Sequence, residues 1–366
     1  MSGDGEGRLD GLDGIRALAI LAVLAFHTGA AWASGGSIGV DVFFVLSGFL
    51  ITSLLLSEAI RTRTIKLRWF YARRVLRLLP ALLVLLAAAA LYAALVPNPV
   101  GTIGLTSGII GSALYVSDFQ AATGHVPVLG LVEHTWSLSI EEHFYLVWPV
   151  LLLMALRRGG VRTVVLVAGV LAVLSAVLPL LLWRGQSSVP RLYFAPDTRA
   201  QQLLVGCLLA LALAHGSATL RGHIARVSTA VAPGALVALL AMVVFGSWRS
   251  SIYYLGGLSV VALLAAMLLA AVVTTPRSRL SRLLAWPPMV GIGRISYGLY
   301  LWHWPVYLVL NSAWLGLSYW PTQAVRVAVV LTLALTSYGV VEKPFLRLQR
   351  YVRPANRPHV LATPTQ

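Results

Sequence analysis

The sequence is poor in charged residues and nearly free of cysteine. Only 11% of its 366 residues are charged and 58% are hydrophobic, whereas soluble domains carry about 25% charged residues. This composition excludes an ordinary soluble domain and indicates a polytopic membrane protein. Cys207 is the single cysteine. An intramolecular disulfide is therefore excluded, and the apolar neighbours of Cys207 predict a buried thiol.

Acidic residues are also scarce, with 12 against 28 basic residues and a net charge of +16. In a soluble protein this excess would suggest a nucleic-acid partner. In a membrane protein, however, Lys and Arg concentrate in the cytoplasmic loops. We therefore expect membrane lipid, and no nucleic acid, as the partner of the basic segments.

Apolar runs predict an all-α membrane bundle of about ten transmembrane helices. If the N-terminus is cytoplasmic, only Arg184, Arg191, Arg199 and Arg249 fall in external segments, and every internal segment is basic, as the positive-inside rule requires. Both termini are then cytoplasmic, in the plasma membrane. The expected spans lie near residues 14–32, 39–57, 77–96, 136–156, 162–183, 199–215, 229–247, 253–274, 292–311 and 324–342.

Three parts of the chain are expected, and one internal segment departs from the pattern. Residues 1–12 predict a disordered cytoplasmic N-terminus, 13–345 a single membrane domain, and 346–366 a cytoplasmic tail.

Residues 102–116 are moderately apolar but short and rich in Gly, Ser and Thr. A crossing there would move the later basic loops outside, so we interpret the segment as re-entrant or interfacial.

His27 lies near the outer end of the first apolar run. Ionisable groups inside a membrane are costly and usually functional, although a histidine can also join two helices by a hydrogen bond. Arg16 lies eleven residues earlier, so it shares a helix face with His27 about 16 Å away along the axis. Asp13 extends the same face. Arg16 has an alternative role, which is to reach lipid headgroups.

A basic cluster opens the third expected span. Arg73 and Arg77 are four residues apart on one helix face, and Arg74 is adjacent. Such guanidinium groups can hold a polyphosphate in fork geometry. The cluster therefore predicts a nucleotide-bearing cosubstrate on the cytoplasmic side, and contact with anionic lipid is the alternative.

Polar residues are dense at the start of the fourth expected span. Glu141 should lie at a depth similar to that of His27, and a carboxylate beside a histidine orients the ring and raises its basicity, as a general base requires. The alternative is a metal site formed by His27, His134, Glu141 and His143. The spacing of His134 and His143 does not favour it, and no HExxH motif is present.

Two weaker signals remain. Asp197 and Arg199, at the outer end of the sixth expected span, are interpreted as a possible boundary ion pair. His303 lies near the middle of the ninth span between Trp302 and Trp304, where the kink expected at Pro305 could create a pocket.

These motifs together resemble the acyltransferase-3 family of integral membrane O-acyltransferases. The matching stretches are LDGIRA at 12–17 with His27, GVDVFFVLSGFLI at 39–51, YARRVLRLLP at 71–80, TWSLSIEEHFYL at 135–146, DTR at 197–199 and ISYGLYLWHWP at 295–305. The resemblance implies a ten-span bundle. Such a bundle would transfer an acyl group, usually from acyl-coenzyme A in the cytoplasm, to a hydroxyl of a sugar, glycan, antibiotic or lipid. We expect no permanently bound cofactor and no metal.

The resemblance also implies roles for individual residues. It makes His27 the catalytic histidine, Glu141 its partner, and Arg73, Arg74 and Arg77 the coenzyme A phosphate contacts, with Arg16 in support. Further substrate or support residues are expected at Asp13, Asp41, Ser137, Asp197, Arg199 and His303. The chain has a second glutamate, Glu142, where the family usually has glutamine, so no neutral amide can act there.

Two questions stay open at this point. His27 could act as a base for direct attack by the acceptor, or carry the acyl group itself. The rival functions are a proton-coupled transporter or flippase that uses His27 and Glu141 as a relay, and a non-catalytic lipid or glycan sensor. The cytoplasmic arginine cluster favours the acyltransferase, because a proton-driven carrier has no need of it.

Overall fold

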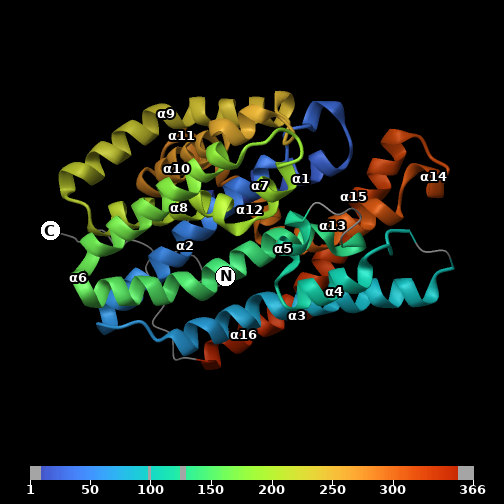
Figure 1. Cartoon of the computed structure of the whole chain (residues 1–366), viewed down its shortest axis with the longest axis horizontal. Helices are drawn as coiled ribbons and strands as arrows, with labels where there is room; N and C mark the ends of the chain where they lie inside the picture. The colour runs from blue at the N-terminus through green and yellow to red at the C-terminus, as the bar shows by residue number, and fades with distance from the viewer. Residues whose placement is uncertain (1–9, 98–99, 124–128, 353–366) are drawn as a thin grey trace.

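The computed structural model describes residues 10–97, 100–123 and 129–352, and this part of the chain is helical and contains no named strand. The expectations for residues 1–9 and 353–366 lie outside it. Figure 1 shows helices packed into one bundle, with α9 along one long edge and α3 and α16 along the opposite edge. The α-helices are α1 (Asp10–His27), α2 (Ile38–Thr62), α3 (Leu67–Leu95), α4 (Leu105–Ala113), α5 (Ser117–Ala122), α6 (Trp136–Leu182), α7 (Val189–Phe194), α8 (Pro196–His215), α9 (Ala218–Phe245), α10 (Leu258–Thr274), α11 (Arg279–Leu284), α12 (Pro287–Arg294), α13 (Ser296–Val309), α14 (Ser312–Leu315), α15 (Tyr319–Ser337) and α16 (Lys343–Val352). Two 3-10 segments, η1 (Ala31–Ala33) and η2 (Gly130–Thr135), and two π segments, η3 (Tyr253–Gly257) and η4 (Tyr338–Glu342), complete the order.

The all-α membrane fold is confirmed, and six helical segments of the described residues are long and apolar enough to cross a membrane. The first and ninth expected spans are not among these six segments, because their helices are too charged or too short. The 18 residues of α1 include two aspartates and one arginine, and α13 has only 14 residues. The number ten and the side on which the termini lie therefore stay predictions. The six segments are Ala31–Thr62, Leu67–Leu95, Gly130–Leu182, Ala218–Phe245, Tyr253–Thr274 and Tyr319–Gln349.

Several element boundaries differ from the expected ones. The fourth and fifth expected spans are two legs of α6, separated only by a left-handed break at Gly160 (φ 67, ψ −159), a conformation that glycine adopts at little cost. Helix α16 continues past the expected domain boundary at residue 345 and packs against α3, where the Gln349 side chain donates a hydrogen bond to the Arg73 carbonyl at 2.8 Å. Helix α4 has nine residues, far fewer than the about 20 that a spanning helix needs.

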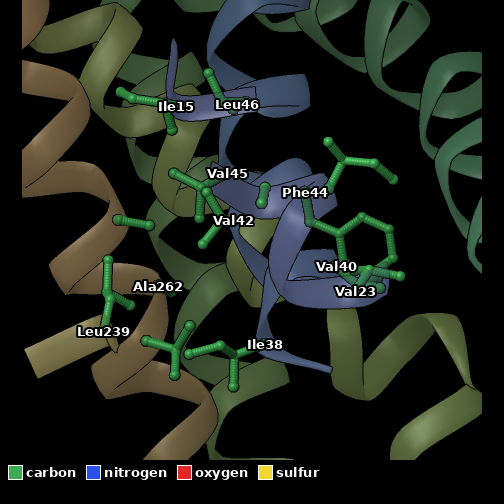
Figure 2. Close-up of a cluster of buried hydrophobic side chains, with 14 of the residues drawn as sticks. Ile15, Val23, Ile38, Val40, Val42, Phe44, Val45, Leu46, Leu239 and Ala262 are labelled. Atoms are coloured by element: carbon green, nitrogen blue, oxygen red, sulfur yellow. The ribbon is translucent and has the colours of Figure 1, made fainter. Parts of the chain in front are cut away.

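The largest core cluster is formed around α1 and α2. Figure 2 shows part of this cluster, to which α1 contributes Ile15 and Val23, α2 contributes Val42, and α9 and α10 contribute Leu239 and Ala262. The opposite faces of the outer helices carry exposed leucines and valines, as expected for surfaces that contact lipid. This packing holds α1, which carries His27, in the centre of the bundle.

Helices α2 and α8 approach each other very closely. A Cβ atom added at Gly48 of α2 would lie 1.8 Å from the Leu203 carbonyl oxygen of α8, and one added at Gly206 would lie 2.1 Å from the Val45 carbonyl oxygen. Small residues at such crossings allow two membrane helices to pack backbone to backbone. The α2–α8 contact in turn fixes the position of Asp41 relative to Arg199.

We expect Gly48→Ala to destabilise the fold by about 1–3 kcal/mol, because the added methyl group forces the two backbones apart. The matched control is Gly169→Ala in α6, where an added Cβ meets nothing within 4 Å and the higher helix propensity of alanine is stabilising. Thermal unfolding in detergent can be followed with a thiol-reactive dye, because the single cysteine, Cys207, is buried. Equal melting temperatures for the two variants would contradict this account of the crossing.

Candidate active site

His27 is the last residue of α1 and lies against two residues of α13. Its ring centroid is 4.9 Å from that of His303 and 4.9 Å from that of Trp304. His303 is fully buried, and its Nε2 lies 3.2 Å from His27 Nδ1. His27 and His303, two separate candidates from the sequence, are therefore neighbours.

The hydrogen bonds of this pair fix which nitrogen atoms carry protons when both rings are neutral. His303 Nδ1 lies 2.6 Å from the Tyr300 carbonyl oxygen, so it must donate, and His303 Nε2 is then an acceptor. His27 Nδ1 lies 3.0 Å from the Val23 carbonyl oxygen and must also donate. Its proton is shared between Val23 and His303. His27 Nε2 is left with a free lone pair, as a general base or nucleophile requires.

His27 lines a cavity of about 320 Å³, which we call the outer cavity. Several of its lining side chains are aromatic. Three of them form a continuous wall, since the Trp136 ring centroid lies 5.0 Å from Tyr193 and the Tyr193 centroid lies 5.2 Å from Trp248. Burial raises the pKa of the Tyr193 phenol to about 12, so its hydroxyl keeps its proton at neutral pH. Glu133 also lines this cavity.

A buried ion pair supports the aromatic wall from behind. Arg199 Nη2 lies 2.8 Å from Asp41 Oδ1, and both side chains are 0% exposed. The Arg199 guanidinium carbon lies 5.1 Å from the Tyr193 ring centroid and 5.9 Å from that of Trp136. Gln202 and Tyr253 donate hydrogen bonds to the Asp41 carboxylate. The network fixes both rings.

The expected pairing of Asp197 with Arg199 is wrong. Asp197 pairs instead with Arg191, at 2.8 Å and 2.5 Å on the exposed side of α7. Asp197 and Arg199 are two positions apart, so on a helix they point in different directions. The partner of Arg199 is Asp41, which lies on another helix, so the residues next to Arg199 in the sequence do not indicate it.

A second cavity, of about 290 Å³, lies on the other side of a shared wall, and we call it the inner cavity. Arg16 of α1 and Arg74 and Arg77 of α3 line it. Val40 and Tyr300 line both cavities. The Tyr300 hydroxyl lies 2.6 Å from Ser137 Oγ and donates to the His134 carbonyl oxygen at 2.7 Å.

Glu141 lies in the inner cavity, so the expected contact between Glu141 and His27 is not among those of the described residues. Tyr145 donates a hydrogen bond to Glu141 Oε2 at 3.0 Å. Arg74 and Arg16 are within electrostatic reach of its carboxylate. A similar depth does not bring the two side chains together, because α6 directs Glu141 into the inner cavity. His303 occupies the partner position instead.

The arginine cluster is divided differently from the expected pairing. Arg73 does not line the inner cavity, and its Nη2 lies 3.9 Å from Glu58 Oε2 of α2. Arg74 stacks over the Tyr145 ring at 4.7 Å, and Arg77 is exposed. The two arginines of α3 that line the cavity are therefore Arg74 and Arg77, three positions apart, rather than Arg73 and Arg77. Residues three apart and residues four apart both share a helix face, so the sequence alone does not choose between the pairs, and the packing of α3 on α2 decides.

The residues of the metal alternative are separated. His27 and His134 both lie near His303, but His143 pairs with Asp118 at 3.2 Å and Glu141 is in the inner cavity. In the described ranges, no group of three or more His, Cys, Asp and Glu side chains could hold a metal ion. Asp13, a further support candidate, is buried in the first turn of α1, where its Oδ2 lies 3.9 Å from Arg294 Nε.

Sequence reasoning missed several residues that line the two cavities. No sequence motif includes Glu133, Trp248 or Tyr193, because the first precedes the TWSLSIEEHFYL motif and the others lie between expected spans. Tyr300 lies within the SYGLYLWHWP motif, in which His303 is the more prominent candidate. A usable signal existed for Glu133, which is an acidic residue directly before the polar start of an apolar helix.

Comparison with known proteins identifies relatives. A family model of an acyltransferase domain matches residues 9–340. Peptidoglycan O-acetyltransferase OatA of Listeria monocytogenes is 36% identical over 348 residues, covering 91% of this chain and 55% of that protein. O-acetyltransferase OatA of Staphylococcus aureus is 33% identical over 346 residues, 92% of this chain and 57% of that protein. Putative peptidoglycan O-acetyltransferase YrhL of Bacillus subtilis is 34% identical over 354 residues, 92% and 54% respectively.

The chain spans a little more than half the length of these curated relatives. No solved structure matches it. The family model nevertheless covers nearly the whole chain, with both cavities inside the matched residues. The chain therefore belongs to the acyltransferase-3 family of membrane proteins.

Proposed function

We propose that this chain is a membrane O-acyltransferase that moves an acyl group from acyl-coenzyme A to a hydroxyl of a glycan. The observation that carries the proposal is the pair of cavities that share Val40 and Tyr300, one lined by arginines and the other by His27. Relatives named as O-acetyltransferases support the transfer of an acyl group, and the peptidoglycan in two of their names supports a sugar polymer as acceptor.

The inner cavity suits the donor. Arg74, Arg77 and Arg16 present guanidinium groups that can bind phosphate oxygens in pairs. Leucine and isoleucine side chains also line this cavity, and they suit an extended pantetheine arm. The thioester then needs to pass only Val40 and Tyr300 to reach His27.

The chemistry requires one base and balances without a further reactant. His27 Nε2 accepts the proton of the acceptor hydroxyl while the oxygen attacks the thioester carbonyl carbon. The carbon–sulfur bond breaks, and the departing coenzyme A thiolate takes the proton from His27. The products are an ester and free coenzyme A thiol. His303 orients the ring of His27 so that Nε2 is unprotonated before the transfer, and Nε2 returns to that state when the thiolate takes the proton.

A test on the donor side is Arg77→Ala. We expect the KM for acetyl-coenzyme A to rise about 10- to 100-fold with a smaller change in kcat, because one charge-assisted phosphate contact contributes about 1.5–3 kcal/mol. Arg74→Ala should act in the same direction. The assay is release of coenzyme A thiol by purified protein in nanodiscs, with a β-1,4-linked N-acetylglucosamine tetramer as the acceptor probe.

The matched control is Arg73→Ala, because Arg73 faces Glu58 rather than the cavity. Its KM for acetyl-coenzyme A should stay within about 3-fold of the wild-type value, as expected for the loss of a weak ion pair. If the wild-type protein transfers no acetyl group from acetyl-coenzyme A, the donor is wrong. If Arg73→Ala raises the KM as much as Arg77→Ala does, the proposed phosphate site is wrong.

A further inference from the structure

The outer cavity combines three features that distinguish it from a purely apolar groove. It holds a row of aromatic faces, the open Nε2 of His27, and the carboxylate of Glu133. Glu133 lies in η2, directly before the helix that carries Trp136. Among the residues that the structure describes, no hydrogen bond or ion pair engages its carboxylate. An acidic group in such a position has its acceptor capacity available for a ligand.

The aromatic wall is preorganised. Trp136 and Tyr193 are buried and are held from behind by Arg199, while Trp248 is half-buried on a loop that follows α9. Phe194 packs edge-on against Trp136 with a centroid distance of 5.1 Å. The faces of such rings carry negative partial charge, which attracts the polarised C–H groups on the flat face of a sugar ring. The wall therefore offers a stacking surface that costs little ordering on binding.

The size and polarity of the cavity indicate what it holds. Its volume of about 320 Å³ is at the lower end of the range for small-molecule sites, about 300–1,000 Å³. A cavity of this volume suits one sugar ring of a glycan better than several. A lipid chain in the same place would set hydrocarbon against the Glu133 carboxyl group, and burying a polar group without a hydrogen-bond partner is unfavourable.

We propose that the outer cavity is a monosaccharide subsite of the acceptor glycan, in which one sugar ring stacks on the wall that Trp248 completes and Glu133 accepts hydrogen bonds from its hydroxyls. Binding of two ring hydroxyls by Glu133 directs a neighbouring hydroxyl toward His27 Nε2. The site thus selects a hydroxylated ring and sets which hydroxyl is acylated. This inference rests on the proposed acyl transfer to a glycan, and it adds the residues that determine specificity.

Two variants test the subsite without removing the reacting group. Glu133→Gln keeps the shape of the side chain and removes its charge, and Trp248→Ala removes the exposed end of the wall. With the N-acetylglucosamine tetramer as probe, we expect the acceptor KM to rise about 10-fold in each variant, as for the loss of one charge-assisted hydrogen bond or one stacked ring. The KM for acetyl-coenzyme A should not change. Trp314→Ala, on the exposed helix α14, is the matched control.

A second measurement does not depend on activity. Tryptophan fluorescence of the wild-type protein should change on titration with the tetramer in the absence of donor, and the dissociation constant should rise about 10-fold in Glu133→Gln. Dodecanol should not compete. The subsite is wrong if the wild-type protein does not bind the tetramer, if dodecanol displaces it, or if both variants keep the wild-type acceptor KM. The absence of acyl transfer with intact sugar binding would instead overturn the proposed function alone.

Discussion

Replacing His27 by alanine is expected to lower the rate of acyl transfer by about 10²- to 10⁴-fold at saturating substrates, the range that a positioned general base contributes. The reason is geometric. His27 Nε2 is the nitrogen of the His27–His303 pair whose lone pair is not used in a hydrogen bond. Alanine leaves the cavities in place, so the KM for acetyl-coenzyme A should change far less than kcat. Thiol release and acetylated tetramer, measured together, give both values.

Graded variants separate the base from the residue that positions it. His303→Ala removes the acceptor for His27 Nδ1–H and should lower kcat less than His27→Ala does, with a changed pH profile. His303→Gln restores an acceptor oxygen and should recover part of the loss. His223→Ala, on the exposed surface of α9, should match the wild type. Wild-type kcat in His27→Ala would remove His27 from the mechanism.

The sequence predicted the helical class and most helices because membrane burial leaves a strong one-dimensional signal. Runs of apolar residues end at charges, prolines and glycines, so the expected spans overlap helices although their boundaries differ. The break in α6 was different. Gly160 interrupts the helix with a single left-handed residue, and no separate loop is needed between the two legs.

The contacts within the site could be predicted only in part, because they depend on which helices become neighbours. His27 and His303 were both identified, but 276 positions separate them, and nothing in the local pattern indicates that α1 and α13 meet. Glu141 was chosen as the partner on depth alone. Depth fixes a position along the membrane normal, whereas a hydrogen bond also requires the correct helix face and the correct neighbour.

The buried pair of Asp41 and Arg199 illustrates the same point and leads to the largest expected effect on stability. We expect Arg199→Ala to destabilise the protein by about 3–5 kcal/mol, because it leaves the Asp41 carboxylate buried without its cation. Both side chains are 0% exposed, so water cannot replace the guanidinium. Thermal unfolding can be followed in detergent through the labelling of Cys207, which becomes reactive only when the core opens.

Two comparisons decide whether the effect comes from the unpaired charge. Arg191→Ala breaks the exposed pair with Asp197 and should cost about 0–1 kcal/mol. The double variant Asp41→Asn with Arg199→Ala should be more stable than Arg199→Ala alone, because the lone charge is gone. A double variant as unstable as Arg199→Ala would mean that the arginine acts through its packing on Tyr193 and Trp136. In that case we expect Arg199→Ala to weaken the proposed binding of a sugar ring as well, since these two rings form part of the wall of the outer cavity.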